Sequence, residues 1–322
     1  MNVGADSGHS DRAWPVYREL LNGGRLADRV KHAAAAVHDC HLCGNDCGID
    51  RTEGSGPCRI ADVVYVASYG PHHGEESVLR GWRGSGTIFF SGCNLHCVYC
   101  QNHDISQHRM GSPVTAGDLA AMMLWLEEQG CHNINLVSPT HVAAHIVPSL
   151  VLAVQAGLMA PIVYNTGGYD GSQALELMNG LVDIYMPDAK YSDAKVAQRL
   201  SSVDDYPAVN RAALREMHQQ VGDLQIDGRG LARRGLLVRH LVLPGGLAGT
   251  TDVTRFLARE LSIDTYVNLM AQYRPAYHAR HCVDADTPLA RPVTSDEYQE
   301  AYRAARRAGL HRFDEAHARL WR

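Results

Sequence analysis

Six short apolar or β-branched segments recur along the middle of the chain, and helical stretches separate most of them. They are TIFF (87–90), INLV (134–137), PIVYN (161–165), VDIYM (182–186), LLVRHLVL (236–243) and YVNLM (266–270). Stretches such as AGDLAAMMLWLEEQG and SLVLAVQAGL carry the helical pattern between them. Strands that alternate with helices form βαβ units and a parallel sheet. Six units are too few for a closed eight-stranded barrel, so the sequence predicts an α/β fold with a partial (βα)6 barrel of the TIM type.

Unusual residues follow these strands. They include a cysteine loop after the first strand and the segments SPTH, NTGG, PDAK, PGG and AQYRP after the others. Because chemistry in such sheets lies at the carboxyl ends of the strands, we expect the functional site to be built from these segments.

The sequence predicts three regions. Residues 1–80 form an N-terminal helical and four-cysteine metal module with a Gly- and His-rich connector over 67–86, residues 81–280 form the barrel core, and residues 281–322 form a C-terminal helical extension. With 322 residues, 45% of them hydrophobic, the chain can bury a large core.

Charge and cysteine usage exclude several classes of protein. A net charge of -5 demands no polyanionic partner, and the C-terminal arginines from Arg303 to Arg322 have no interleaved aromatic residues, so nucleic acid is not an expected partner. No apolar run reaches the roughly 20 residues of a membrane helix. Seven of the nine cysteines fall in two tight clusters, while Cys131 and Cys282 are expected to be inert free thiols. Clustered cysteines without a signal peptide predict a cytoplasmic protein.

The segment SGCNLHCVYCQN places Cys93, Cys97 and Cys100 within eight positions. A structural zinc takes four ligands, whereas three thiolates on a [4Fe–4S] cubane leave one iron with an open coordination position. An open position is typical of a catalytic metal. The alternative is a zinc or ferredoxin-type site that His96 or His103 completes.

This C-x₃-C-x₂-C pattern, with Tyr99 before its last cysteine, resembles the signature of the radical S-adenosylmethionine (SAM) superfamily. The resemblance implies that the open iron binds SAM, that reductive cleavage gives methionine and a 5′-deoxyadenosyl radical, and that this radical abstracts a hydrogen atom from a substrate. It also implies an electron donor of the flavodoxin or ferredoxin type.

Longer segments, among them NINLVSPTHV, VDIYMPDAKY and YVNLMAQYRPAY, resemble a subfamily labelled pyruvate formate-lyase activating enzyme-like. The substrate that this resemblance suggests is a glycyl residue of a partner protein, with a peptide or a small molecule as alternatives. A non-catalytic iron–sulfur or zinc protein, acting in electron transfer or RNA binding, is the alternative from another class.

The same resemblance implies which residues contact SAM. Tyr99 would lie against the adenine, or serve only in packing, and Asn165 and Thr166 would contact the ribose and methionine, or form a plain turn. Lys190 and Arg239 would bind the SAM carboxylate and Asp188 would orient Lys190 or meet the ribose, unless Asp188 and Lys190 are a surface ion pair.

One segment departs from the activase pattern. Where activases carry Gly-Gly-Glu, this chain has Ser138-Pro139-Thr140-His141. Ser138 and Thr140 are therefore predicted to contact the SAM ammonium, since a hydroxyl can accept from it. His141 is open to a ligand or a non-ligand role.

Two further features lie upstream. Cys40, Cys43, Cys47 and Cys58 form a complete set of four ligands, either for a structural zinc or for an auxiliary [4Fe–4S] cluster. The acidic pair Glu75 and Glu76 would either cover the active site or pair with arginines.

Overall fold

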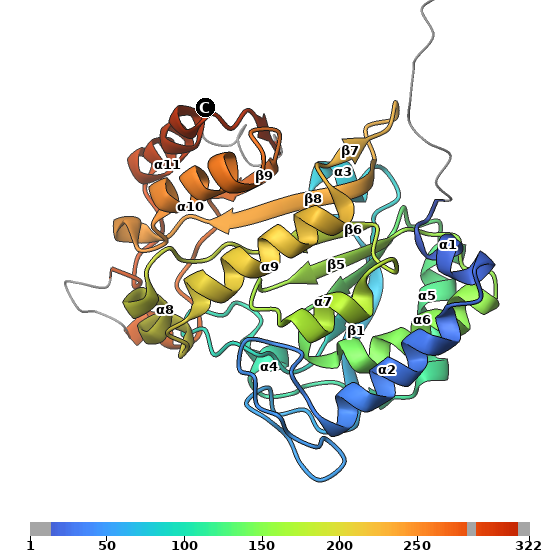
Figure 1. The fold of residues 1–322 in the computed structure, drawn as a ribbon. Helices are drawn as coiled ribbons and strands as arrows, with labels where there is room; N and C mark the ends of the chain where they lie inside the picture. Colours follow the sequence, from blue (N-terminus) through green and yellow to red (C-terminus); the bar gives the residue numbers. More distant parts are fainter. Residues whose placement is uncertain (1–13, 282–287, 315–322) are drawn as a thin grey trace, which may run out of the picture.

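The computed structural model describes residues 14–281 and 288–314 (Figure 1). Cys282 and the arginines at 319 and 322 lie outside the described residues. Its main feature is one curved sheet in which the strands run in the spatial order β10-β9-β8-β6-β5-β4-β2-β1-β3.

Six strands of this sheet, which are well separated in the sequence, run parallel to one another. They are β2 (Ser85–Phe90), β4 (Ile134–Val137), β5 (Ile162–Thr166), β6 (Ile184–Pro187), β8 (Ala232–Leu241) and β9 (Tyr266–Met270). Each overlaps one of the six segments predicted from the sequence. The partial parallel barrel is therefore confirmed.

Helices join the parallel strands, and most of them cover the outer face of the sheet (Figure 1). They are α5 (Ala116–Glu128), α6 (Ala143–Gln155), α7 (Ser172–Met178), α9 (Tyr206–Val221), α10 (Thr250–Phe256) and α11 (Ser295–Ala308). The other two, α4 (His103–Ser106) and α8 (Ala194–Ser201), lie beside the cysteine loop. The first long connecting helix begins where the sequence predicts, because Thr115 and Asp118 form a reciprocal capping box at its N-terminus.

The alternation of side chains along each strand separates the packed outer face from the barrel interior. On β4, Ile134 and Leu136 belong to the core shared with the helices, whereas Asn135 and Val137 lie on the opposite face. Every second position of the strands thus points into the barrel, and the last inward residues lie beside the loops at the carboxyl ends.

The connector predicted over residues 67–86 is partly wrong. Its first part belongs to β1 (Val64–His72), which pairs antiparallel with β2 and with β3 (Ser112–Val114), and its second part contains α3 (Ser77–Arg80). β1 begins with the apolar residues Val64, Tyr65 and Val66, but its second half is polar and largely exposed, unlike the buried strands. Its regularity comes from backbone pairing with β2, which composition does not reveal.

Both ends of the described chain pack on the barrel. The N-terminal helices α1 (Tyr17–Asn22) and α2 (Leu26–His38) contribute Tyr17, Leu20 and Leu26 to the same core as the strands. Beyond α11, the two-residue strand β10 (Arg312–Phe313) pairs parallel with β9, and β7 (Gln225–Ile226) pairs with β8. Within the described ranges, no helix combines the length and the apolar character that crossing a membrane needs.

Candidate active site

The cysteine loop follows β2 and is fastened by its backbone. The amides of His96 and Val98 donate to the carbonyls of Ser201 and Leu200 at 3.2 and 2.9 Å, at the end of α8. Gly92 begins the loop with φ +84°, and a Cβ there would lie 2.7 Å from Ile60. Only glycine combines this conformation with so close an approach of the N-terminal module.

The loop forms one side of a cavity of about 370 Å³ at the carboxyl ends of the strands. The cavity brings together the three cysteines and every predicted SAM-contact residue except Tyr99. These are Cys93, Cys97, Cys100, Ser138, Thr140, Asn165, Thr166, Asp188, Lys190 and Arg239. Its volume is that of a small-molecule site.

Three charged side chains form an ion-pair triad in this cavity. Asp188 accepts from Lys190 Nζ at 2.6 Å and from Arg239 Nε at 2.9 Å. Burial alone would raise the pKa of Asp188, but Arg239 and Lys190 outweigh it and hold that pKa below its ordinary value. The side chains are only 14 to 19% exposed, so this is no surface ion pair. Two cations against one carboxylate leave a net positive charge, which suits the binding of a further carboxylate.

A buried carboxyl group that the sequence reasoning missed lies behind two of the predicted contacts. Asp170 Oδ1 contacts the hydroxyls of Thr140 at 2.6 Å and Tyr164 at 3.0 Å, and its Oδ2 contacts Thr166 Oγ1 at 2.7 Å. The two threonine hydroxyls also contact each other at 2.8 Å. These four contacts share only three hydroxyl hydrogens, so the network is complete when Asp170 itself carries a proton. Burial, which raises the pKa of Asp170, acts in the same direction.

The glycine pair after β5, Gly167 and Gly168, is needed for the packing of the loops as well as for access to a ligand. Gly168 has φ +73°, and a Cβ there would lie 2.0 Å from the carbonyl oxygen of Asp188. The loops after β5 and β6 can therefore touch only because this residue is glycine. Gly167 itself lines the cavity.

Tyr99 does not line the cavity. Its hydroxyl contacts that of Tyr191, which contacts Ser201 Oγ at 2.7 Å, and Ser201 Oγ lies 3.0 Å from Cys97 Sγ. This chain of hydroxyls supports the cysteine loop from behind. A contact between Tyr99 and adenine stays a prediction.

His141 lies under the cysteine loop and outside the cavity lining. Its Nε2 lies 2.9 Å from the carbonyl oxygen of Ser91, to which it donates. Burial lowers the pKa of His141 to about 4, so the ring is neutral. It ties the end of β4 to the start of the loop.

The donor set of the loop fits an iron–sulfur cluster. Burial, together with the negative charge that Cys97 would carry as a thiolate, raises the pKa of Cys93 to about 12. Bound iron relieves the repulsion between thiolates, which are its soft ligands. His96 is engaged elsewhere, because its two ring nitrogens contact Gln107 Oε1 at 2.8 Å and the Pro57 carbonyl at 3.1 Å.

The N-terminal cysteines surround a buried arginine. Arg51 donates to Cys40 Sγ at 3.2 Å and to Cys58 Sγ at 3.7 Å. Across residues 14–281 and 288–314, no three or more His, Cys, Asp or Glu side chains are arranged around a single metal ion, and this holds for the three-cysteine loop as well as for this module. The metal of this module, zinc or a second cluster, stays a prediction.

The acidic pair meets no arginine at ion-pair distance among the described contacts. Glu75 lines the cavity and lies 3.1 Å from His72 Nδ1, while Glu76 Oε1 accepts from Asn268 Nδ2 at 2.8 Å. Of the two roles open to the pair, covering the site fits Glu75. His72, Phe89 and Asn94 also line the cavity, and no motif in the sequence marked them.

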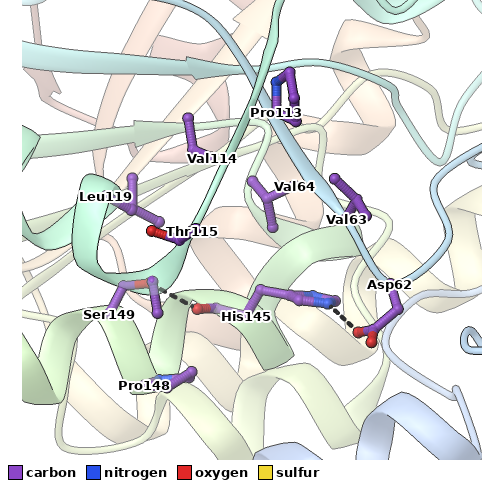
Figure 2. Close-up of a pocket in the computed structure, with 11 residues that line it drawn as sticks. Asp62, Val63, Val64, Pro113, Val114, Thr115, Leu119, His145, Pro148 and Ser149 are labelled. Atoms are coloured by element: carbon purple, nitrogen blue, oxygen red, sulfur yellow. Dashed lines mark hydrogen bonds and ion pairs between the residues drawn. The ribbon is translucent and has the colours of Figure 1, made fainter.

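A second cavity, of about 460 Å³, lies away from this site between β1, β3, α5 and α6 (Figure 2). Its wall combines the apolar Val64, Val114 and Leu119 with a contact of 2.9 Å between His145 Nε2 and Asp62 Oδ1. None of the predicted site residues lines it.

Comparison with known proteins supports the iron–sulfur assignment. Residues 80–202, which contain the three-cysteine loop, match the family described as 4Fe-4S single cluster domain. A radical SAM methyltransferase from Sphaerobacter thermophilus superposes over 92% of each chain, with a TM-score of 0.46 and 15% sequence identity. That likeness is too low to support an argument about activity.

Another protein, which is similar in sequence over most of the chain, shows the family to which the chain belongs. The chain is 30% identical over 302 residues to Uncharacterized protein MJ0674 from Methanocaldococcus jannaschii, and the alignment covers 91% of this chain and 81% of that protein. Because this identity extends over most of both chains, the chain belongs to the family of that protein.

Proposed function

We propose that the chain is a radical SAM enzyme of the pyruvate formate-lyase activating enzyme-like type. The observation that carries the proposal is the single cavity in which three cysteines face the triad of Asp188, Lys190 and Arg239. A ferredoxin or a zinc module has no use for such a cavity, whereas a cluster with a vacant iron needs room for a ligand beside it.

Cys93, Cys97 and Cys100 would hold a [4Fe–4S] cluster, which would supply the electron for the reductive cleavage of SAM to methionine and a 5′-deoxyadenosyl radical. Lys190 and Arg239 bind the SAM carboxylate, and Asp188 holds both cations in place. Thr140 and Thr166 accept from the SAM ammonium, and Asn165 contacts the ribose.

The reaction then consists of hydrogen-atom transfer from a substrate C–H bond to C5′. The resemblance to the activases makes a glycyl Cα of a partner protein one such donor. Its test is the doublet of a Cα radical with one remaining hydrogen in the electron paramagnetic resonance (EPR) spectrum of that partner. The reductant that we propose is a protein of the flavodoxin or ferredoxin type.

The central experiment is anaerobic reconstitution with iron and sulfide, reduction with dithionite and addition of SAM. We expect 5′-deoxyadenosine to form in the wild type and not in Cys97→Ala, with the exposed Lys195→Met variant as a control that behaves like the wild type. A reconstituted wild type that binds a full cluster yet never cleaves SAM refutes the proposal.

A further inference from the structure

Arg51, in the N-terminal module, is a buried cation without a carboxylate partner. It is 2% exposed, and its guanidinium stays protonated in proteins. Within the described residues no Asp or Glu forms an ion pair with Arg51, and its Nη1 atom has no acceptor. Because buried charges are paired with opposite charges, the module needs a negative group that is not a carboxylate.

The side chain of Arg51 is bound through sulfur. Its Nε lies 3.2 Å from Cys40 Sγ and its Nη2 lies 3.7 Å from Cys58 Sγ, and the part of the chain that the structure describes offers it no other acceptor. A neutral thiol is a weak acceptor, whereas a thiolate accepts charge-assisted hydrogen bonds from a guanidinium. The two contacts therefore suit cysteines that carry negative charge.

The backbone of the module brings these groups together. The amide of Cys40 donates to the carbonyl of Ile49 at 3.2 Å, and the amide of Gly48 donates to the carbonyl of Cys40 at 3.0 Å, which folds the segment back on itself. The amide of Arg51 donates to the carbonyl of Val37, in the last turn of α2, at 2.9 Å. The backbone therefore fixes the position of Arg51 beside the cysteines.

The other two cysteines of the module complete a set of four sulfurs. Cys43 is 8% exposed, and its Sγ lies 3.5 Å from Asn45 Nδ2, which donates to it, whereas Cys47 is exposed. Four thiolates are the ligand set of a structural zinc or of a [4Fe–4S] cluster. In each of these centres the negative charge of the thiolates exceeds the positive charge of the metal core. Either centre therefore supplies the negative charge that Arg51 needs.

Neutral thiols are a poor substitute for such a centre. As thiols, Cys47 and Cys58 can donate to the carbonyls of Cys40 and Ile60, but the two contacts are long, at 3.7 and 3.8 Å. In that state no described group carries a negative charge in contact with Arg51, so its buried charge is unbalanced. Metal binding converts the cysteines to thiolates and balances it.

We infer that Arg51 is the charge partner of an anionic metal centre that Cys40, Cys43, Cys47 and Cys58 hold as four thiolates. Arg51 acts through the sulfur ligands, so it is a positioning residue and not a ligand. The four sulfurs do not converge on a single ion in the described chain, so binding draws them together or spreads them over the corners of a cluster. The inference does not depend on SAM chemistry, and the experiment distinguishes zinc from a [4Fe–4S] cluster.

The test uses the full chain with Cys97→Ala as the parent, because the metal bound to that variant belongs to the module and not to the loop. The parent is reconstituted anaerobically, either with iron and sulfide or with zinc, and its metal content is measured by elemental analysis. We expect about one zinc or about four irons per chain. A parent that binds neither metal overturns the inference without any bearing on SAM cleavage by the wild type.

Variants of Arg51 in this parent test its part in metal binding. Arg51→Met should lower the affinity for the metal about 10- to 100-fold in competition with a chelator, because the sulfurs lose the group that orients them. Arg51→Lys keeps the charge but not the planar fork, so its affinity should lie between the two. Lys31→Met removes an exposed charge on α2 and is the matched control, with the affinity of the parent. Equal affinities of Arg51→Met and the parent overturn the inference.

A second measurement separates a charge partner from a side chain that only fills space. Arg51→Met should lower the urea midpoint of the metal-loaded protein but not that of the metal-free protein, where it replaces an unbalanced buried charge by an apolar side chain. An equal decrease in both forms indicates packing alone and contradicts the inference. If the metal is a cluster, the loss of a positive charge and of two N–H···S contacts should also make its reduction potential more negative in an EPR redox titration, and an unchanged potential would contradict the assigned role.

Discussion

The two cysteine groups of this chain differ in what surrounds them. Cys93, Cys97 and Cys100 line a cavity beside two threonine hydroxyls and a charged triad. The four cysteines of the N-terminal module do not line that cavity, and Arg51, at 2% exposure, fills the space beside two of them. One group lies beside a cavity, whereas in the other Arg51 occupies the space next to Cys40 and Cys58, and Cys47 is exposed. We expect a catalytic metal site to have such a cavity and a structural or relay site to lack one.

The two groups nevertheless share a framework. Asn45 in the module donates to the carbonyl of Asn94, next to Cys93, at 2.8 Å, and its amide nitrogen lies 3.5 Å from Cys43 Sγ. The amide of Gly44 donates to the carbonyl of Tyr169 in the loop after β5. The module therefore supports the loops of the active site, whatever metal it holds.

The largest effect expected is that of removing one cysteine from each group. Cys97→Ala should lose about four irons per chain and all SAM cleavage, since the vacant iron exists only in an intact loop cluster. Cys43→Ala should lose only the metal of the module, which is about four irons for a cluster or one zinc for a structural site. Iron, zinc and 5′-deoxyadenosine are measured together. Loss of the loop cluster in Cys43→Ala would contradict the division into two independent sites.

A second effect concerns the charged triad, which only the open site has. Lys190→Met should weaken SAM binding by about 10- to 100-fold, because the SAM carboxylate loses one cation and Asp188 loses a partner. Equilibrium dialysis of the unreduced, reconstituted protein measures the dissociation constant. Lys195→Met, an exposed lysine on α8, is the matched control. Equal affinities in the two variants would remove Lys190 from the SAM site.

Most residues that line the cavity beside Cys93, Cys97 and Cys100 could be predicted from the sequence, and the reason is geometric. Asp188 and Arg239 are 51 residues apart, yet Asp188 directly follows β6 and Arg239 lies near the end of the neighbouring β8, and parallel strands bring their carboxyl ends to one edge. The strand pattern together with the resemblance was enough to place them in one cavity.

Asp170 and the hydroxyl chain behind Cys97 were not predictable in the same way. Asp170 reads as a turn residue after two glycines, and only the packing of β4 against β5 brings Thr140 to it. Likewise the second half of β1 is exposed and has no apolar run, so its antiparallel pairing with β2 emerges only in three dimensions. Contacts made by the backbone or by a single hydroxyl group are hard to predict, because they produce no regular pattern of residue types in the sequence.

The third prediction concerns Asp170 and the hydroxyl groups that contact it behind the cavity. If Asp170 is protonated, asparagine reproduces it, with its oxygen accepting from Thr140 and Tyr164 and its amide donating to Thr166. Asp170→Asn should then stay close to the wild type in stability. Asp170→Ala, which leaves buried hydroxyls unpaired, should lose about 1–3 kcal/mol in the free energy of unfolding by urea titration. The reverse ranking would show that the carboxylate is ionised.

The smallest effect expected is a difference in acid sensitivity between the two regions. His240 lies beneath the triad, with Nδ1 donating to the carbonyl of Ala189 at 2.6 Å and Nε2 accepting from Thr250 Oγ1 at 2.8 Å. Burial lowers the pKa of His240 to about 4. In the module, by contrast, the bond to Asp50 raises the pKa of the exposed His38.

A lowered histidine pKa means that the unfolded chain binds the proton first as the pH falls, so stability decreases below the unfolded value of roughly 6.5. Between pH 7 and pH 5.5, His240 should account for a loss of about 1 kcal/mol in the free energy of unfolding. Urea titrations at the two pH values measure this, and His240→Gln should lower the difference by that amount while the exposed His73→Gln leaves it unchanged. If both variants keep the full difference, the acid-sensitive part of the molecule lies elsewhere than under the triad.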